Sequence, residues 1–252
     1  MKMKVLVVCK DEGSKKDESC IMIEEEGFEV VYAWKNTLGK KELEGVDFVI
    51  SIGGDGTALS ASHYLEDKPL LAVNSKPGKS EGVLTVINIG DLDEKLKEIK
   101  KKGFELEELE RMKVSVNGKD LGMLVLNDVF IANEKAYLIS RYKLKIDGQE
   151  EEQKSSGLIF STGTGSTAWF RSAGGKPFSA QSKHIKMIVR EPYHGKLSSF
   201  SMVRKTLNEK EKAEVEILCP SVLAIDSIRE FKLKEGDRVV IEIAEKALKR
   251  IV

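Results

Sequence analysis

The chain has 252 residues, which is enough for one large domain or two modest ones. Its 41 basic and 41 acidic residues leave no net charge. A nucleic-acid groove or a surface for anionic membranes needs a basic excess, so this balance argues against both. We therefore expect a partner that is neither a nucleic acid nor a membrane.

Three cysteines and three histidines are scattered along the chain without the spacing of metal ligands, so we expect no metal held by the protein alone. This use of cysteine favours a reduced, cytoplasmic compartment. The apolar run near the N-terminus covers only residues 5–9, which is shorter than a signal peptide or a spanning helix requires.

The first hundred residues alternate short apolar runs with helical patterns. Strands are expected at residues 4–9, 29–33, 47–52 and 69–73, and helices at residues 15–26, 57–65 and 91–102. Ser14 lies near the first N-cap position, and Gly27 and Gly103 are suited to end helices. This alternation predicts a doubly wound parallel sheet covered by helices, with ligands beyond the carboxyl ends of the strands.

After residue 103 the pattern changes to short strands joined by turns. Asn117-Gly118 and Asp147-Gly148 each join two strand-like runs, as in hairpins with type I′ turns. Strands are expected at residues 112–116, 121–126, 137–146, 158–161, 185–189, 215–218 and 239–243. We therefore expect an α/β domain over residues 1–103 and a predominantly antiparallel β domain over residues 104–252. The last residues could return to the first domain, and we expect the site in a cleft between the two.

The sequence Gly-Gly-Asp-Gly-Thr at residues 53–57 directly follows an apolar strand. Glycines let backbone N–H groups approach a phosphate closely, and a carboxylate can take a proton or hold a metal. The segment is therefore a candidate for phosphoryl chemistry. An ordinary strand-to-helix turn accounts for it equally well.

Two familiar nucleotide-binding patterns fail. Gly78-Lys79-Ser80 matches the end of a P-loop, but that motif needs glycine at the position of Val73. Gly163-x-Gly165-x-x-Ala168 matches a dinucleotide fingerprint, yet it lies in the β-rich half. No acidic residue follows it at the expected spacing of about twenty residues.

Two further polar segments interrupt apolar strands. Residues 161–166 are six small residues in a row, four of them bearing hydroxyl groups, which suits a flat polar ligand such as a nucleoside. A flexible linker is the alternative. Asn127 and Asp128 stand together between apolar residues, and a buried polar pair needs partners. They form either a bulge or turn, or a pair that binds ligand hydroxyl groups.

The three segments, in this order and spacing, resemble the NAD kinases. The resemblance covers most of the chain and is closest to the mitochondrial-type branch and its prokaryotic relatives. Residues 74–82, 153–157 and 189–192, and Gly163 in place of a common proline, carry the branch-specific likeness. The first motif alone recurs in diacylglycerol, sphingosine and phosphofructo-kinases, whereas the set of three does not.

The resemblance implies transfer of a phosphoryl group from ATP to the 2′-hydroxyl of the adenosine ribose of NAD, giving NADP. It implies that Asp55 is the general base and that Mg²⁺ accompanies ATP. It also implies a homo-oligomer, a dimer or larger. The substrate-binding residues implied are Gly53, Gly54, Gly56, Thr57, Asn127, Asp128, Thr164, Thr167, Ala168, Trp169 and Ser172.

Four positions depart from the family pattern: Trp169 replaces a tyrosine, Ser156 an acidic residue, Val83 a phenylalanine and Ser227 a glycine. Other functions therefore stay open. One is a lipid or sugar kinase of the same superfamily, although no large basic amphipathic stretch suggests a membrane-binding face. Another is a nucleotide-binding protein without turnover, against which the presence of Asp55 argues.

Overall fold

The computed structural model describes residues 2–10, 18–79, 82–195 and 200–252. The chain forms two compact units: unit 1 is Met1–Glu108 with Leu248–Val252, and unit 2 is Leu109–Ala247. The boundary lies five residues beyond residue 103, where the composition of the sequence changes. The last five residues belong to unit 1.

Unit 1 is built on a sheet with the strand order β2-β1-β3-β4-β19-β6, and β5 pairs with β4. The pairs β1–β2, β1–β3, β3–β4, β4–β5 and β4–β19 are all parallel. The strands are β1 (Lys4–Cys9), β2 (Glu29–Trp34), β3 (Phe48–Gly53), β4 (Leu70–Asn74), β5 (Ile87–Asn88), β6 (Leu106–Leu109) and β19 (Leu248–Ile251). The predicted parallel α/β fold is confirmed.

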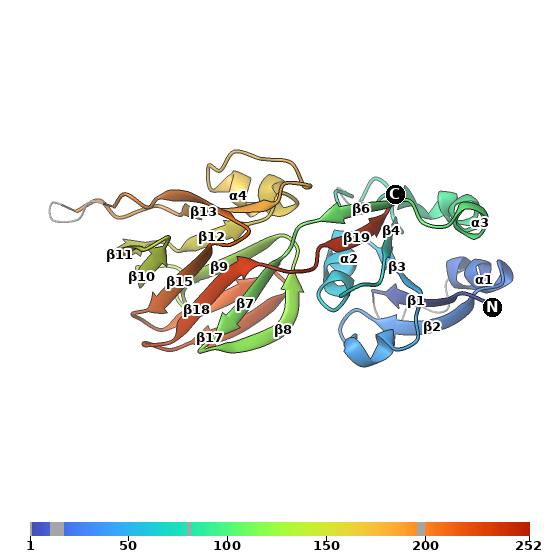
Figure 1. The fold of residues 1–252 in the computed structure, drawn as a ribbon, viewed down its shortest axis with the longest axis horizontal. Coiled ribbons are helices and arrows are strands. Elements are labelled where there is room, and N and C mark those ends of the chain that lie inside the picture. The colour runs from blue at the N-terminus through green and yellow to red at the C-terminus, as the bar shows by residue number, and fades with distance from the viewer. Residues whose placement is uncertain (1, 11–17, 80–81, 196–199) are drawn as a thin grey trace. The chain divides into compact units, whose positions relative to one another are not determined.

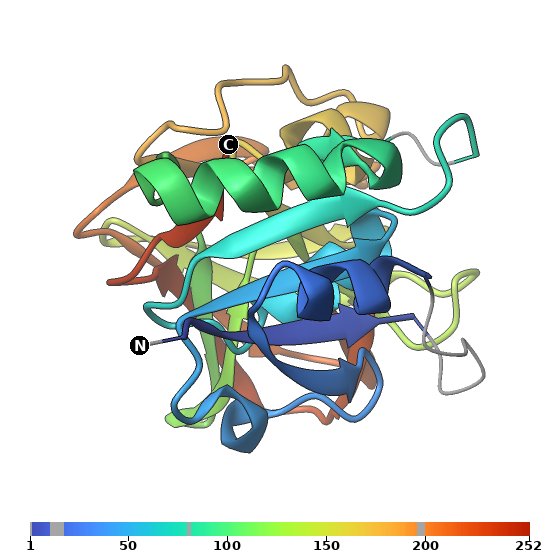
Figure 2. The ribbon, with the colours of Figure 1, turned by 90° about the vertical axis from the view of Figure 1, so that its right-hand side faces the viewer.

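Helices cover both faces of this sheet. The helical segments are α1 (Glu18–Glu25), α2 (Asp55–Ser62), α3 (Leu92–Lys102) and the 3₁₀ turns η1 (Lys40–Leu43) and η2 (Ile89–Asp91). Figure 2 shows α1 and α3 side by side on one face, where Ile23 and Leu96 pack into the core with Val7. α2 packs against β1, β3 and β4 (Figure 1).

The sequence locates the helices of unit 1 to within a few residues. α2 begins at Asp55, two residues before the expected start, and it ends at Ser62. Gly27 and Gly103 have φ angles of +82° and +81°, which confirms that they follow helix ends in the left-handed region that glycine favours. Ser14 lies outside the described residues.

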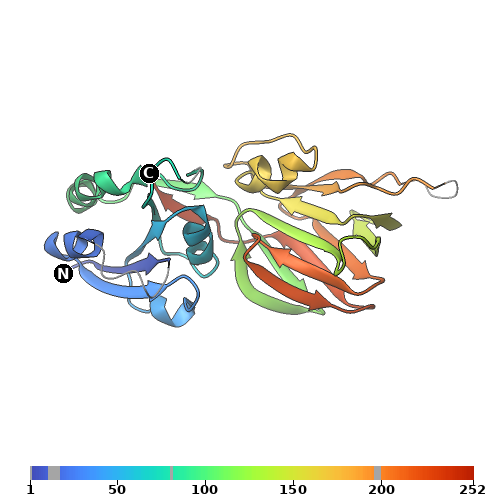
Figure 3. The ribbon, with the colours of Figure 1, turned by 180° about the vertical axis from the view of Figure 1, so that it is seen from behind.

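Unit 2 consists of two antiparallel six-stranded sheets, with the orders β11-β10-β15-β18-β7-β8 and β14-β13-β12-β9-β16-β17 (Figure 3). The strands of the first are β7 (Met112–Val116), β8 (Lys119–Val125), β10 (Ser140–Ile146), β11 (Gln149–Ser155), β15 (Lys212–Ile217) and β18 (Arg238–Ile243). Those of the second are β9 (Asp128–Asn133), β12 (Leu158–Ser161), β13 (His184–Val189), β14 (Arg204–Asn208), β16 (Ser221–Ile225) and β17 (Arg229–Leu233). Inward-facing side chains of both sheets, such as Leu144, Val215 and Phe160, form one apolar core.

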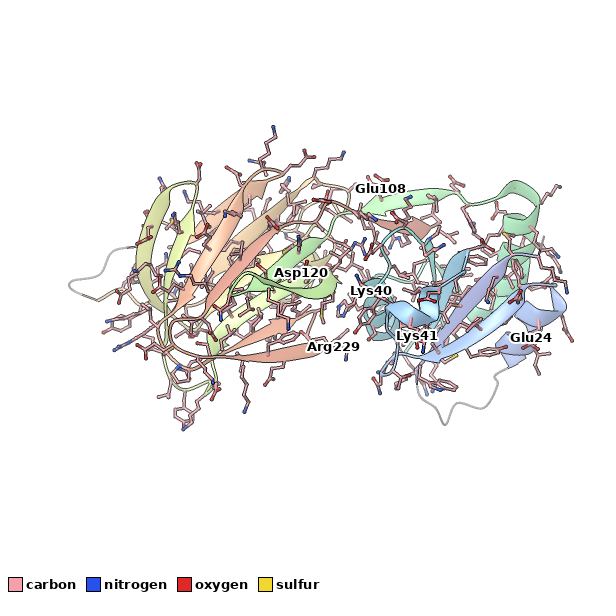
Figure 4. The ribbon with its side chains drawn as sticks, turned by 60° about the horizontal axis from the view of Figure 1, so that its bottom comes forward. Glu24, Lys40, Lys41, Glu108, Asp120 and Arg229 are labelled. Carbon is pink, nitrogen blue, oxygen red and sulfur yellow. The ribbon has the colours of Figure 1, made fainter. Side chains whose placement is uncertain are left out.

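The two predicted hairpin turns are confirmed. Asn117 and Gly118 have φ angles of +52° and +76°, and Asp147 and Gly148 have +49° and +73°. Positive φ at both central positions defines the type I′ turn, which matches the twist of the flanking strands. Beside the first turn, the carboxylate of Asp120 on β8 (Figure 4) accepts a hydrogen bond from the N–H of Gly122 at 2.6 Å. This bond stabilises the start of β8, the second strand of the hairpin.

Within the residues that the structure describes, no helix is long and apolar enough to cross a membrane.

Candidate active site

The carboxylate of Asp55 lies at the start of α2, directly after β3. The chain turns between strand and helix through Gly53 and Gly54, the latter at the N-cap position. A Cβ atom on Gly53 would lie 2.3 Å from the Oγ1 atom of Thr57, so only glycine permits this approach. Gly56 is exposed and has open space around it, whereas Thr57 is buried.

Both oxygens of the Asp55 carboxylate accept backbone hydrogen bonds. The N–H of Leu84 donates to Oδ1 at 2.9 Å and the N–H of Val83 donates to Oδ2 at 3.1 Å. These two residues stand in the segment Gly82-Val83-Leu84-Thr85, which departs from the family pattern only in Val83. The side chain at that position is 53% exposed, so the contact with Asp55 is made by the backbone and survives the change of side chain.

In unit 2, Asn127 lies in the connection between β8 and β9, and Asp128 is the first residue of β9. The polar pair therefore spans the end of a short connection and the start of a strand. The Oδ1 atom of Asn127 is buried and has no hydrogen-bond partner among the described residues. An unpaired buried acceptor costs free energy, so this atom is suited to a ligand.

Asp128 is 4% exposed. Burial, followed by the neighbouring charge of Asp226, raises the pKa of the Asp128 carboxyl to about 7. A carboxyl group in this state gains or loses its proton near neutral pH, and it can serve a ligand hydroxyl group either as acceptor or as donor.

The small-residue segment lies against Asn127. Thr162 donates its N–H to the Asn127 carbonyl at 3.0 Å, and its hydroxyl group donates to the Leu126 carbonyl at 2.5 Å. A Cβ atom on Gly165 would lie 2.2 Å from the same Asn127 oxygen, so this glycine permits the contact. The structure therefore brings the second and third sequence motifs together, and the flexible-linker interpretation is wrong because residues 161–166 are buried.

Thr164 is 8% exposed, and its Oγ1 atom has no partner in the described part of the chain. Thr167 and Ala168, in contrast, are exposed at the turn before α4 (Trp169–Ser172). The ring of Trp169 packs edge-on against Phe130, with centroids 4.9 Å apart. These residues form one continuous stretch from the buried motif to the surface.

Trp169 and Ser172 line a pocket of about 210 Å³ together with Arg190 and Glu191. The Arg190 guanidinium lies 5.8 Å from the Trp169 ring centroid, and Glu191 accepts a hydrogen bond from the Ser156 hydroxyl at 2.5 Å. Neither residue is among the sequence-predicted binding residues. Both residues belong to the sequence Val-Arg-Glu-Pro at residues 189–192. That sequence indicated the branch of the family, but it did not indicate that Arg190 and Glu191 line a pocket.

Asp226 is a second residue that sequence reasoning missed as part of the site. Its carboxylate accepts the backbone N–H groups of three consecutive residues: Leu126 at 3.0 Å, Asn127 at 2.8 Å and Asp128 at 2.9 Å. Asp226 and Ser227 form the turn between β16 and β17. In the sequence, Asp226-Ser227 stands out only because Ser227 replaces the glycine of the family pattern, and nothing in it indicates a contact with residues 126–128.

The predicted site residues thus form two groups. Asp55 and the glycines around it belong to unit 1, and Asn127, Asp128 and the stretch 164–172 belong to unit 2. Gly163 and Gly165, which matched the dinucleotide fingerprint, follow a strand of an antiparallel sheet, so that motif's parallel β-α-β setting is absent around them.

Comparison with known proteins identifies the family in both halves of the chain. Residues 3–104 match the model of the ATP-NAD kinase N-terminal domain, and residues 126–252 match that of the ATP-NAD kinase C-terminal domain. The NAD kinase of Methanopyrus kandleri is 32% identical over 213 residues, which cover 79% of this chain and 76% of that protein. A probable NADH kinase of Oryza sativa is also 32% identical, over 60% of this chain and 53% of its own length.

Solved structures agree with this result. An NAD kinase from Archaeoglobus fulgidus in complex with ATP is 25% identical, with a TM-score of 0.79 over 99% of this chain and 94% of that one. The yeast NADH kinase complexed with NADH has a TM-score of 0.83 at 17% identity, over 100% and 83% of the two chains, and it supports the fold. By its sequence over both halves and by its fold, the chain belongs to the NAD kinase family.

Proposed function

We propose that the chain is an ATP-dependent NAD kinase, which transfers the terminal phosphoryl group of ATP to the 2′-hydroxyl of the adenosine ribose of NAD and gives NADP and ADP. The observation that carries this proposal is a single carboxylate, Asp55, held at a strand-to-helix turn of glycines in a chain that matches the family in both halves.

Asp55 acts as the general base. As the 2′-oxygen forms its bond to the terminal phosphorus, the hydroxyl proton passes to a carboxylate oxygen of Asp55, and the bond between that phosphorus and the leaving ADP oxygen breaks. A carboxylate is a weak base, so its contribution is chiefly alignment. The N–H groups of Val83 and Leu84 supply that alignment because they bind both carboxylate oxygens and fix the orientation of the group.

The residues of unit 2 bind the dinucleotide. The unpaired Oδ1 of Asn127 and Oγ1 of Thr164 offer buried polar atoms to the ligand, and the Asp128 carboxyl offers a hydrogen-bond partner for hydroxyl groups. Trp169 and Ser172, which line the 210 Å³ pocket, complete the set. The pocket combines the apolar side chains of Ile159 and Ala173 with the charged groups of Arg190 and Glu191.

Mg²⁺ enters this proposal as the partner of ATP. Among the described residues, no group of three or more His, Cys, Asp or Glu side chains is arranged to hold a metal ion. Mg²⁺ prefers phosphate oxygens and water, and it would supply charge neutralisation on the phosphate chain during transfer. A homo-oligomer, a dimer or larger, is also proposed, and light scattering on the purified protein would test it.

A coupled assay tests the function. The purified chain is incubated with NAD, ATP and Mg²⁺, and NADP is measured with an NADP-specific dehydrogenase. Omitting ATP or NAD gives the matched controls. NADP formation that needs both substrates supports the proposal. Phosphorylation of a lipid or sugar instead of NAD would assign another kinase, and NAD binding without turnover would assign a non-catalytic nucleotide-binding protein.

A further inference from the structure

A second pocket of unit 2 has a volume of about 230 Å³. It is lined by Phe170 of α4, by Gly174, Gly175 and Lys176 of the segment that follows, and by Lys186, Met187, Arg204, Lys205 and Thr206 of β13 and β14. The first pocket is lined by Trp169, Ser172, Arg190 and their neighbours, and no residue lines both pockets. The second pocket is therefore a separate feature of the surface.

The pairing of β13 with β14 decides which side chains face this pocket. Lys186 is paired with Thr206, Met187 with Lys205, and Ile188 with Arg204. Met187 is buried in the core between the two sheets. Because successive side chains of a strand point to opposite faces, Lys186 and Arg204 point away from that core, toward the side covered by α4.

The contacts of these side chains agree with this alternation. The Lys186 Nζ atom lies 4.4 Å from the ring centroid of Phe178, in the segment after α4, and Arg204 donates from Nη2 to the carbonyl of Gly174 at 3.2 Å. Lys205 points the other way, since its Nζ donates to Gln149 of the opposite sheet at 2.7 Å. Lys186, Arg204 and Lys176 thus supply the cationic side chains of the pocket.

These three cations lack acidic partners. No described carboxylate lies within 4.0 Å of Lys176, Lys186 or Arg204, whereas on the other sheet Lys143 lies 3.9 Å from both Glu150 and Glu216. Burial, followed by the charge of Lys186, lowers the pKa of the neighbouring His184. In a chain with equal numbers of acids and bases, this concentration of unpaired cations is a local feature.

We propose that this pocket binds an inorganic oligophosphate, an anion of the di- or triphosphate class. A guanidinium group and two ammonium groups offer charged donors to several phosphate oxygens at once, and arginine suits the planar two-oxygen contact. Three separate cationic groups match the several charged groups of a phosphate chain better than a single phosphate. The site does not depend on the proposed kinase activity.

Calorimetric titration with inorganic tripolyphosphate tests the site. NAD and a non-hydrolysable ATP analogue are present at saturating concentration, so that the proposed substrate sites are occupied. The double variant Lys186→Gln/Arg204→Gln should bind tripolyphosphate at least about tenfold more weakly than the unaltered chain, since two charged hydrogen-bonding groups are lost. Lys232→Gln is the matched control, because it removes an exposed cation on β17, the opposite edge strand of the same sheet, which does not line the pocket, and the affinity of this variant should stay within about twofold.

Melting temperatures of all variants show whether each is folded. The single variant Lys186→Gln leaves the hydrogen bond from Arg204 to Gly174 intact, and it should still bind tripolyphosphate more weakly than the unaltered chain. The proposal is overturned if the unaltered chain does not bind tripolyphosphate, if the double variant binds it equally well, or if Lys232→Gln causes the same loss. Sulfate at equal ionic strength separates specific binding from a general salt effect, and equal heats for sulfate and tripolyphosphate would also overturn it.

Discussion

Asp226 and Asp128 are joined by two hydrogen bonds, although they lie 98 positions apart in the sequence. The Asp128 N–H donates to the Asp226 carboxylate at 2.9 Å, and the Asp226 N–H donates to the Asp128 carbonyl at 2.9 Å. Since the same carboxylate also binds the N–H groups of Leu126 and Asn127, the turn between β16 and β17 fixes the backbone that carries the polar pair. The binding residues of unit 2 thus depend on a distant side chain.

Asp226→Ala should destabilise the protein and weaken NAD binding together. The change leaves three backbone N–H groups without their acceptor, and we expect a loss of about 2 kcal/mol or more in the free energy of unfolding. Urea denaturation measures this loss, and calorimetry measures the affinity for NAD. Glu230→Ala, which removes an exposed acid on β17, is the control and should change stability by less than about 0.5 kcal/mol. Equal stability of the two variants would show that the Asp226 contacts contribute nothing.

Asp128→Asn should alter how stability depends on pH. The pKa of Asp128 is raised from its ordinary value of 3.8 to about 7, so the folded protein holds this proton more tightly than the unfolded chain does. The corresponding stability is fully present below about pH 4 and is lost as the pH rises toward 7. Unfolding free energies measured from pH 4 to 8 should therefore fall less steeply in Asp128→Asn than in the unaltered chain. Parallel curves would contradict the raised pKa.

Ser227→Gly should stabilise the turn that carries Asp226. Ser227 has a φ angle of +54°, in the left-handed region where a side chain is strained, and its side chain is exposed. Glycine adopts this conformation without strain, and we expect a gain of about 0.5–1 kcal/mol. Thermal and urea unfolding measure it. Ser227→Ala is the matched control because it keeps the Cβ atom. A similar gain in stability in both variants would show that the backbone of Ser227 is not strained.

Local signals in the sequence predict the fold better than they predict the site. Asn117-Gly118 predicts its turn because the turn needs positive φ at these two residues alone. The bounds of β1 and β7 match the expected ones because the apolar pattern of each strand lies within the strand itself. The strands β14, β16 and β17 were missed, since their short patterns acquire meaning only through their partners in the sheet. The motifs identified Asn127 and Asp128, but the contact of Asp226 with their backbone crosses about one hundred residues and leaves no local signal.

Gly163→Ala should destabilise the protein. Glycine stands here in place of the proline that is common in the family. A Cβ atom at position 163 would lie 1.9 Å from the carbonyl oxygen of Ser179 and 2.7 Å from the Cα atom of Ala180. The backbone must move, at a cost of about 1–3 kcal/mol, and proline meets the same obstacle. Gly90→Ala is the control, since nothing lies within 4 Å of its added atom. Equal melting temperatures of the two variants would contradict the close contact.

Asp55→Asn should abolish most turnover while NAD binding is retained. Asparagine keeps the size of the side chain but cannot take the hydroxyl proton, and general-base assistance is worth about 10²–10⁴-fold in rate. The coupled NADP assay gives kcat, and calorimetry on the same preparation gives the NAD affinity. We expect that affinity to change little because the proposed dinucleotide contacts lie in unit 2.

Glu94→Gln, at an exposed position of α3, is the matched control and should leave kcat unchanged. The melting temperature shows whether the loss of one N–H acceptor beside Val83 and Leu84 disturbs the fold. A folded Asp55→Asn variant that keeps more than about a tenth of the original kcat would remove Asp55 from the role of general base.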